Sequence, residues 1–528
     1  MGREDSKHVV IVGGGTAGWL TAGILAARLG LRDRDDLKIT LVESPGVPIL
    51  GVGEGTWPTI RHTLRVMGIS EAAFLGACDA TFKQGSTFVG WRTSPDEKSA
   101  QSYTHPFTPP HKFGDIDWAS ALAGSDKLNS FDEAVCFQSA LCNLGLAPKT
   151  RTSAEYEGVG NYAYHFDAGK VARFLSAYCT ATLGICHIID DISGCTQSAD
   201  GAITALNTRE SGLIEADLYI DCSGQHGVLI DRVYHVPLVN CRDVLFVDKA
   251  LAIQVPYVDD DAPIASVTLA TAQPAGWIWD IGLTTRRGIG YVYSSAYCSP
   301  EEANATLAGY VRAITGQDLP AKPRSIDINT GYRANFWVHN CVAIGVASGF
   351  VEPLEASSIA MIEVSANHIA EHLTFDRDVM RIEAQRFNRK LARVWQDVID
   401  FLKLHYVLSD RPEPFWAANR ARDSIPQSLQ DNLHVWQNRA PRAGDFPETS
   451  QLFGPASYQY ILYGMGVVCR PESGAHGLVD QESVRLGLAE VEATTAKLSR
   501  MLGPNRDVIR NMTHDLHGLP KDRAAASL

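Results

Sequence analysis

The chain has 528 residues, 45% of them hydrophobic and 20% charged, a composition typical of a globular protein that buries a large core in two or three domains. Its formal net charge is -13 at pH 7. A protein that binds nucleic acid or an anionic membrane surface carries basic patches, so we expect neither kind of partner. The segment 1–7 is charged, and no later stretch is long and apolar enough to span a bilayer. These features predict a cytoplasmic protein.

The eleven cysteines are scattered along the chain, without a C-x-x-C pair or a Cys/His cluster at metal-ligand spacing. We therefore expect reduced thiols, no disulfide framework and no bound metal. The sequence also contains no internal repeat and no low-complexity tract, which argues against a solenoid or a fibrous protein.

A nucleotide-binding signal stands at the start of the chain. Residues 8–12 predict a buried parallel strand, residues 13–18 contain the pattern G-x-G-x-x-G, and residues 19–31 predict a helix rich in Ala and Leu. A second strand, predicted over residues 38–43, ends in Glu43, whose carboxylate can accept hydrogen bonds from ribose hydroxyls. An acid at this place favours an unphosphorylated adenosine ribose, hence FAD or NAD and not NADP.

Each position of the glycine-rich turn has a physical task. Gly13 permits the tight turn, Gly15 lets a pyrophosphate approach the backbone, and Gly18 lets the helix pack closely on the strand. Thr16 and Ala17 begin the helix, where backbone N–H groups and the helix dipole attract phosphates.

Two further candidates follow before residue 90. A second glycine-rich loop at residues 49–56 includes Gly53, and its backbone could pack against a flat cofactor or an anion. Lys83 lies in an uncharged, partly apolar neighbourhood. A lysine is usually solvated, but in a cleft its pKa would fall, and its amine could act as a nucleophile or a hydrogen-bond donor.

The next two segments, residues 103–107 and 162–167, both contain aromatic residues. Residues 103–107, which include His105 and Phe107, are predicted to be irregular, whereas residues 162–167 lead into a helix over 168–183. Taken alone, both segments are better explained by structure than by function.

The central part of the chain predicts more strands. Trp277 and Trp279 lie two residues apart, so on a strand both rings point to the same face. An arbitrary W-x-W is most often a core strand. Residues 216–224 predict another strand ending in Ser-Gly, and alternating aromatics at 288–293 predict an antiparallel or mixed sheet, which we place over the cofactor.

Another strand, followed by small residues, is predicted over residues 341–350, which include Gly345 and Gly349. A helix is then expected to begin after residue 351 and to continue to 373, with Glu355 in its first turn. Glu355 is then either a simple first-turn acid or a functional carboxylate.

From residue 381 the pattern is helical, and His405 falls on the apolar face, which predicts a packed core histidine. A Pro/Gly-containing loop is expected at 441–455, further helices from 458 and over 481–502, and a disordered tail at 520–528.

Together these segments resemble the flavin-dependent tryptophan halogenases from about residue 8 to about residue 416. The resemblance rests on segments that follow one another in the order found in that family. They are the fingerprint at 13–18, the loop at 53–56, Lys83, residues 164–167, residues 221–224, the paired tryptophans and residues 349–355.

The resemblance implies an α/β fold: a doubly wound, glutathione-reductase-like FAD-binding domain with an inserted sheet at residues 1–380, and a mostly helical lobe that covers the substrate at residues 381–528. Gly345 and Gly349 would join the cofactor site. A separate reductase would supply the reduced FAD, since no second nucleotide fingerprint stands out in this chain. Reduced FAD, O2 and a halide (chloride or bromide) would then yield hypohalous acid.

In members of the family, the residue that matches Lys83 holds or converts this oxidant, and the one that matches Glu355 assists the lysine and the cationic ring intermediate. The backbone around Ser357 and Ser358 would hold the halide. The family positions that line the indole site correspond to His105, Phe107, Trp277 and Trp279.

Three features depart from the family pattern. Gly282 replaces a proline and should loosen the turn after the tryptophans, and Ala356 replaces a hydroxyl-bearing residue near the lysine. The Tyr-Tyr and Glu pattern that grips free tryptophan is missing, and residues 453–460 stand in the corresponding region. We therefore expect a substrate that bears an indole ring but is not held by its amino and carboxyl groups as free tryptophan is.

Two other functions remain open: an FAD monooxygenase of the same fold, and a flavoprotein that binds indoles or a peptide without turnover. A monooxygenase holds its substrate against the flavin, and it has no obvious task for Lys83 and Glu355. The sequence leaves the oligomeric state open, with a homodimer among the alternatives.

Overall fold

The computed structural model describes residues 6–47, 53–93, 101–123, 125–150, 152–446, 452–469 and 480–514. The predicted loop residues 49–52 and the predicted tail at 520–528 lie outside this part of the chain.

A six-stranded sheet carries the nucleotide fingerprint. Its strands, in spatial order, are β20 (Trp337–Val338), β21 (Cys341–Ala343), β12 (Leu218–Asp221), β1 (Lys7–Val12), β2 (Leu37–Glu43) and β8 (Cys186–Ile189). All neighbouring pairs are parallel except β20 with β21. The strands predicted from short apolar runs are therefore confirmed, and segments far apart in sequence return to one sheet.

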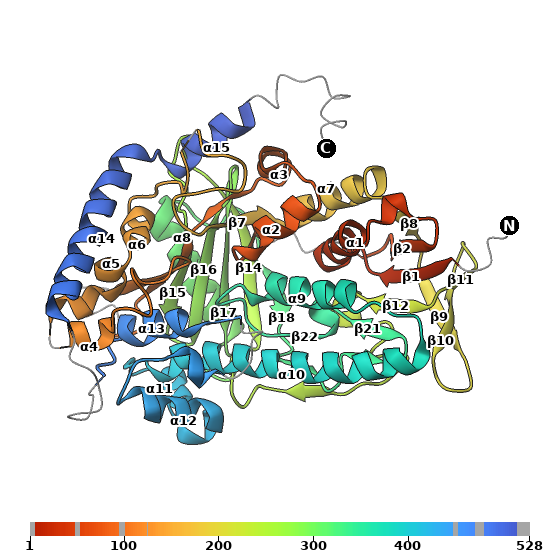
Figure 1. The fold of residues 1–528 in the computed structure, drawn as a ribbon. Coiled ribbons are helices and arrows are strands. Elements are labelled where there is room, and N and C mark those ends of the chain that lie inside the picture. The colour runs from red at the N-terminus through yellow and green to blue at the C-terminus, as the bar shows by residue number, and fades with distance from the viewer. Residues whose placement is uncertain are drawn as a thin grey trace.

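The two faces of this sheet are covered differently. Val9 and Ile11 join the core cluster that contains α1 (Thr16–Leu29). Val10 and Val12 point the other way and pack with the antiparallel sheet of β9 (Ile192–Gln197), β10 (Ile203–Thr208) and β11 (Leu213–Glu215). Alternate side chains of one strand thus serve both layers, and Figure 1 shows this small sheet near the N-terminus.

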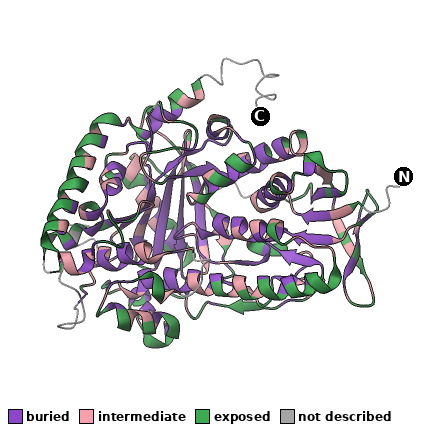
Figure 2. Ribbon diagram, in the orientation of Figure 1, coloured by how far each residue is buried: buried purple, intermediate pink, exposed green. Residues whose placement is uncertain are grey.

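A seven-stranded sheet forms the centre of the molecule (Figure 1). In spatial order its strands are β18 (Arg324–Asp327), β14 (Lys249–Pro256), β17 (Arg286–Tyr293), β16 (Gly276–Gly282), β15 (Thr268–Gln273), β5 (Gly85–Val89) and β6 (Ser102–Pro106). Every residue of β16, the strand with the paired tryptophans, is buried, and Figure 2 shows the middle strands in purple. The predicted mixed sheet is confirmed. The prediction of an irregular segment at 103–107 is wrong for 103–106, because these residues pair with β5 as strand β6.

Two small antiparallel sheets complete the strands. One contains β3 (Gly53–Gly55), β7 (Ala163–Asp167) and β4 (Thr81–Lys83), and the other contains β13 (Leu238–Asn240), β19 (Gly331–Arg333) and β22 (Gly349–Phe350). In the first, Lys83 lies opposite Ala163, and Gly55 lies opposite His165, so these four residues share one face.

Helices cover the sheets and dominate the C-terminal part. Those up to residue 371 are α2 (Thr59–Val66), α3 (Glu71–Ala77), α4 (Trp118–Leu122), α5 (Phe131–Val135), α6 (Phe137–Asn143), α7 (Ala168–Ala181), α8 (Pro300–Thr315) and α9 (Ser357–Glu371). They are followed by α10 (Arg377–Val407), α11 (Pro414–Asn419), α12 (Gln427–Trp436), α13 (Pro455–Gly464), α14 (Gln481–Met501) and α15 (Asn505–His514). The predicted α/β fold with a helical C-terminal region is confirmed, while the division at residue 380, which falls within α10, stays a prediction.

Candidate active site

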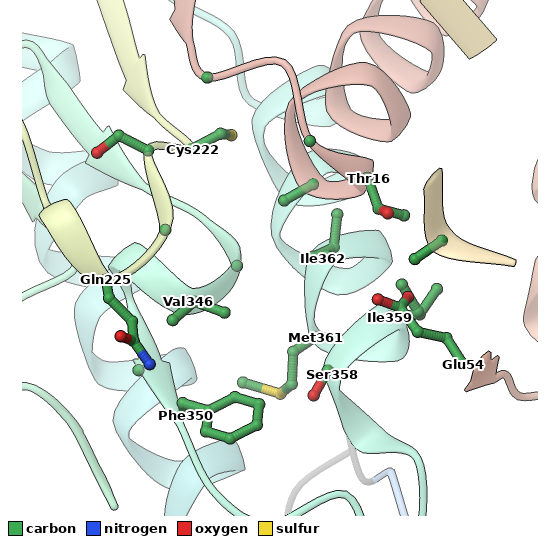
Figure 3. Close-up of a pocket in the computed structure, with 18 of the residues that line it drawn as sticks. Thr16, Glu54, Cys222, Gln225, Val346, Phe350, Ser358, Ile359, Met361 and Ile362 are labelled. Atoms are coloured by element: carbon green, nitrogen blue, oxygen red, sulfur yellow. The ribbon is translucent and has the colours of Figure 1, made fainter. Parts of the chain in front are cut away.

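A cavity of about 630 Å³ opens where the fingerprint turn meets α9 and the central sheet, and its size is that of a cofactor cleft. It lies beyond the carboxyl ends of β1 and β2, where ligands bind in open parallel sheets. Figure 3 shows Thr16 at the start of α1 and Met361 and Ile362 of α9 on its wall, with Gln225 and Phe350 on another side.

The glycines of the turn have the geometry that a dinucleotide requires. Gly13 has φ +114°, and a Cβ there would lie 2.4 Å from the carbonyl oxygen of Cys222. A Cβ on Gly18 would lie 1.8 Å from the Gly13 oxygen, so Gly18 provides the close helix–strand contact and does not line the cavity. A Cβ on Gly15 would meet nothing within 4 Å. Gly15 thus borders open space in the cavity, and the first turn of α1 has no side-chain cap.

Glu43 stands at the end of β2 with its carboxylate directly over the turn. A Cβ on Gly14 would lie 2.1 Å from the carboxyl group of Glu43. His187 Nε2 lies 3.1 Å from Glu43 Oε2, which fixes the acid from the far side. Glu43 also lines the cavity, so it stands where the sequence predicts a ribose contact.

Three glycines from later in the chain, which are predicted to belong to the cofactor site, also reach this cavity. Gly53, Gly345 and Gly349 line it, and Gly345, with φ +69°, packs so closely on α1 that a Cβ would lie 2.7 Å from that of Ala17. Together with Thr16 and Ala17, they show that the fingerprint, the second glycine-rich segment and the segment after β21 meet at one site.

The helix that follows Glu355 begins later than the sequence predicts. Pro353 and Glu355 precede α9, which starts at Ser357. The reason is Ala356, whose φ of +52° is left-handed and cannot continue a helix. Ser357 and Ser358 line the cavity at the α9 N-terminus, which has no side-chain cap. This end therefore offers backbone N–H groups to an anion.

Lys83 lies outside the cavity, behind a thin wall. It is only 1% exposed, and its Nζ lies 5.4 Å from the centre of the Phe107 ring. A Cβ on Gly55 would be 3.1 Å from Lys83 Nζ and 3.5 Å from the Ala356 methyl group, and both Gly55 and Ala356 line the cavity. Burial lowers the pKa of Lys83 to about 8, an effect that the charge of Glu355 opposes.

Glu355 is buried between two histidines. Its Oε1 lies 2.9 Å from His105 Nδ1 and 3.1 Å from His405 Nε2. Its backbone oxygen accepts a hydrogen bond of 2.7 Å from Trp57 Nε1. Burial raises the pKa of Glu355, but the charge and hydrogen bonds of the two histidines outweigh it and lower the pKa to about 2. His405 is a core histidine, as predicted, but it also contacts this carboxylate.

The paired tryptophans share one face of β16, with ring centres 6.4 Å apart. Trp279 lines the cavity described above and lies against Gly290, where a Cβ would come within 2.1 Å of its ring. Trp277 is fully buried, and its Nε1 donates a hydrogen bond of 2.6 Å to Glu352 Oε2. The two rings thus differ in surroundings more than the spacing suggests. Gly282 is part of β16, so it does not form a loosened turn, and its carbonyl accepts a hydrogen bond from Thr81.

The model of the tryptophan halogenase family matches residues 8–481 of the chain. The chain belongs to this family. The 7-chloro-L-tryptophan 6-halogenase KtzR of Kutzneria sp. (strain 744) is 34% identical over 532 residues, which cover 96% of this chain and 99% of KtzR.

Solved structures of similar proteins support the same family assignment. The tryptophan halogenase of Shewanella frigidimarina NCIMB 400 superposes with a TM-score of 0.93 and 43% identity, covering 98% of this chain and 99% of that one. Tar14 is described as a tryptophan C-6 flavin-dependent halogenase from taromycin biosynthesis. It superposes with a TM-score of 0.88 and 33% sequence identity, covering 96% of this chain and 100% of Tar14. The protein is therefore a flavin-dependent halogenase, and the predicted enzyme class is confirmed.

Further aromatic residues, which the sequence did not identify as site residues, lie near His105, the histidine that contacts Glu355. Phe401 stacks on Phe453 with ring centres 3.8 Å apart and meets His105 at 5.9 Å. The Tyr460 ring lies 6.0 Å from His105. Phe453 and Tyr460 belong to residues 453–460, and Tyr460 brings this segment beside His105, one of the predicted substrate residues. Its only signal in the sequence was a cluster of aromatics.

The part of the halogenase that the structure describes contains no helix long and apolar enough to cross a membrane. In the same residues, no group of three or more His, Cys, Asp or Glu side chains could hold a metal ion. All eleven cysteines belong to the described residues, and each is a free thiol.

Proposed function

We propose that the halogenase uses reduced FAD, O2 and a halide to make hypohalous acid, and that Lys83 directs the halogen to an indole-type substrate. Bound FAD would supply the oxidation of halide to hypohalous acid. The turn at Gly13 and Gly15 would hold its pyrophosphate, and Glu43 its ribose. The free N–H groups at Ser357 and Ser358 would hold chloride or bromide beside it.

The position of Lys83 carries this proposal. Its amine is buried outside the cofactor cavity, with Gly55 and Ala356 between them. A monooxygenase needs its substrate inside the cavity against the flavin, whereas an oxidant as small as hypohalous acid can pass a wall of such small residues. The buried lysine therefore favours halogenation over the alternative, an FAD-dependent aromatic monooxygenase.

Glu355 would complete the chemistry beyond the wall. Lys83 either binds the hypohalous acid or takes its halogen with release of water. The ring carbon of the indole then forms a carbon–halogen bond while the oxygen–halogen bond breaks in the first case and the nitrogen–halogen bond in the second. Glu355 accepts the proton that the ring carbon then loses, so the net change is replacement of hydrogen by halogen and formation of water. A buried carboxylate also stabilises the cationic ring before that proton leaves.

The aromatic cluster supports an indole as substrate. His105 and Phe107 flank Lys83 and Glu355, and Phe401 and Tyr460 add further ring faces. Because the Tyr-Tyr and Glu grip is missing from residues 453–460, we propose an indole-bearing molecule other than free tryptophan as the preferred substrate. Reduced FAD would come from a separate reductase.

One experiment separates these functions. The protein is incubated with a flavin reductase, NADH, FAD, O2 and a panel of indoles, with either chloride or bromide, and product masses are recorded. A halogen isotope pattern supports the proposal, whereas a gain of one oxygen that does not depend on halide supports the monooxygenase. A missing product across a broad panel would instead favour binding without turnover. If the protein turned over free tryptophan as efficiently as indole, the proposed substrate preference would be wrong.

A further inference from the structure

The two histidines that touch Glu355 bind the same oxygen. His105 on β6 and His405 on α10 both contact Oε1, at 2.9 Å and 3.1 Å. All three side chains are at least nine-tenths buried. Among the described residues, no side chain or backbone group donates a hydrogen bond to Oε2. One oxygen of Glu355 is thus held twice, and the other is left for the reaction.

The contacts of His405 determine how many protons it carries. Its Nδ1 lies 2.9 Å from the backbone oxygen of Phe401. A carbonyl oxygen only accepts, so Nδ1 bears a hydrogen. Nε2 faces the Glu355 oxygen at 3.1 Å, where two lone pairs would repel one another. A second proton must therefore lie between Nε2 and Oε1. Oε1 also faces His105 Nδ1, and the two histidines lower the pKa of Glu355 to about 2, so this proton belongs to His405 and the pair is an imidazolium beside a carboxylate.

We propose that His405 is a positioning residue of the halogenation site: as an imidazolium it fixes Glu355 Oε1 and keeps the carboxylate charged, so that Oε2 can accept the ring proton. Its contribution to catalysis rests on the proposed function, whereas its protonation state does not.

The surroundings of His405 suit a cation that is paired. Its ring centre lies 4.9 Å from that of Phe88, 5.2 Å from Phe401 and 6.0 Å from Trp91. Aromatic faces attract a cation, but an isolated charge buried among them would be costly. Glu355 offsets that cost, and because it also bonds to His105, the carboxylate has two donors for its charge.

Other ionisable groups near the pair do not replace this partnership. Lys83 on β4 and Tyr103 on β6 both feel the charge of Glu355. Burial raises the pKa of Tyr103 well above its usual value, so this phenol stays neutral. The next residue of α10, Tyr406, donates its hydrogen bond to Glu352. Glu355 is thus the anion that pairs with the charged His405 ring.

Nuclear magnetic resonance of the full chain with 15N-labelled histidine tests the protonation directly. The His405 signals are assigned by their loss in His405→Gln. We expect both ring nitrogens to be protonated in the folded protein, because Nδ1 faces a carbonyl oxygen and Nε2 faces Glu355. In Glu355→Gln, one of them should become unprotonated. A single bare ring nitrogen on His405 in the unaltered protein would overturn the proposal.

Activity then tests the positioning role. His405→Phe, which cannot donate to Glu355, should slow halogenation at least about 10-fold with FAD affinity unchanged. His405→Gln, whose amide can donate, should recover part of the rate. His368 on α9 is the matched control, since it is also buried and packs on Phe387 at 5.2 Å.

Equal rates for His405→Phe and His368→Phe would overturn the positioning role. If the unaltered protein halogenates no indole, the proposed function fails, while the resonance experiment still decides the protonation of His405.

Discussion

Trp277 Nε1 donates a hydrogen bond of 2.6 Å to Oε2 of Glu352, and Tyr406 donates one of 2.5 Å to the same oxygen. Burial raises the pKa of Glu352 to about 7, although both donors oppose the rise. One of the two paired tryptophans is therefore fixed by a buried carboxyl group, whereas its neighbour Trp279 lines the cavity proposed to hold FAD.

This difference predicts different effects for the two tryptophans. Trp277→Phe should lower the free energy of unfolding by about 1–3 kcal/mol, because Glu352 loses a donor in a buried place. Trp279→Phe should chiefly weaken FAD binding, because it removes part of the cavity wall. Denaturant unfolding and FAD titration of both variants provide the measurements. The reverse assignment of the two effects would contradict the structural distinction.

Lys83→Met should reduce halogenation by at least about 10²-fold, since methionine keeps the apolar stem but removes the amine. FAD affinity should not change, because Lys83 does not line the cavity. The control is Lys403→Met, which removes another buried lysine, one that binds Asn419 and the backbone oxygen of Val244. We expect that control to lose stability but to retain halogenation. Substantial halogenation by Lys83→Met would remove this lysine from the mechanism.

Gly15→Val should abolish FAD binding without unfolding the protein. Its backbone, with φ −78° and ψ −175°, suits any residue, and the new side chain would enter open space in the cavity. Gly309→Val on α8 also meets nothing within 4 Å, so it controls for the cost of adding the same side chain elsewhere. Thermal unfolding without FAD and FAD fluorescence titration separate the two effects. Normal FAD affinity in Gly15→Val would show that the cofactor's phosphates bind elsewhere.

The sequence was enough to predict the glycine-rich turn at residues 13–18, because the turn, the strand before it and the helix after it all lie within residues 8–43. The tight turn and the close helix–strand contact require glycine at fixed positions in this short segment. The strand with the paired tryptophans and the mixed sheet around it were predicted for the same reason, since a period of two is a local property. Lys83 and Glu355 were candidates from their own neighbourhoods, but only the family resemblance assigned them roles.

Contacts across long stretches of chain were not predictable. Glu355 and His405 are 50 residues apart, and Trp277 and Glu352 are 75 apart, so tertiary packing alone brings them together. The late start of α9 was missed because Ala356 adopts a left-handed conformation that its residue type disfavours.

Glu363 on α9 gives the protein a pH-dependent loss of stability. Thr59 donates a hydrogen bond of 2.7 Å to it, and Thr63 donates another. Burial nevertheless raises its pKa from 4.5 to about 7. The folded state therefore binds more protons than the unfolded state between these pH values. Folding stability should fall as pH rises through this window, by up to about 1.4 kcal/mol per pH unit.

Glu363→Gln should remove this dependence, because an amide does not ionise. Denaturant unfolding of both proteins at several pH values between 4.5 and 7 gives the difference in unfolding free energy, which should grow in favour of the variant as pH rises. Subtracting the two curves cancels the similar buried carboxyls Glu54 and Glu352. A difference that stays constant with pH would contradict the raised pKa.

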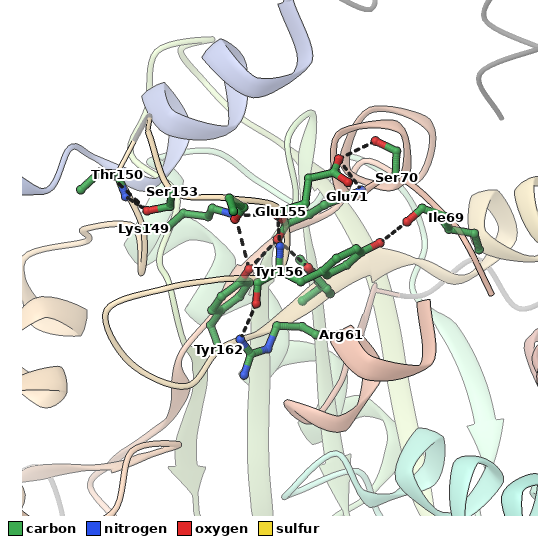
Figure 4. Close-up of polar contacts among 12 residues, drawn as sticks. Arg61, Ile69, Ser70, Glu71, Lys149, Thr150, Ser153, Glu155, Tyr156 and Tyr162 are labelled. Carbon is green, nitrogen blue, oxygen red and sulfur yellow. Dashed lines mark hydrogen bonds and ion pairs between the residues drawn. The ribbon is translucent and has the colours of Figure 1, made fainter. Parts of the chain in front are cut away.

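A fully buried ion pair supports the strands behind Lys83 (Figure 4). Lys149 Nζ lies 2.6 Å from Glu71 Oε2, with exposures of 1% and 0%. Glu71 Oε1 accepts hydrogen bonds of 2.6 Å from Tyr162 and 2.7 Å from Tyr164. Tyr164 belongs to β7, which pairs with β4, so these contacts anchor the strand next to Lys83.

Removing both charges of this pair should cost less than the sum of the two separate removals. Glu71→Gln or Lys149→Met should each lower the free energy of unfolding by about 3–5 kcal/mol, because each leaves a buried charge without its partner. The double variant should lose less than the sum of the two, since neither charge then remains. The exposed pair of Glu482 and Arg485, removed in the same way, should leave stability nearly unchanged, because water screens both charges. Denaturant unfolding of all these variants gives the coupling energy, and strictly additive losses at Glu71 and Lys149 would show that the two charges do not depend on one another.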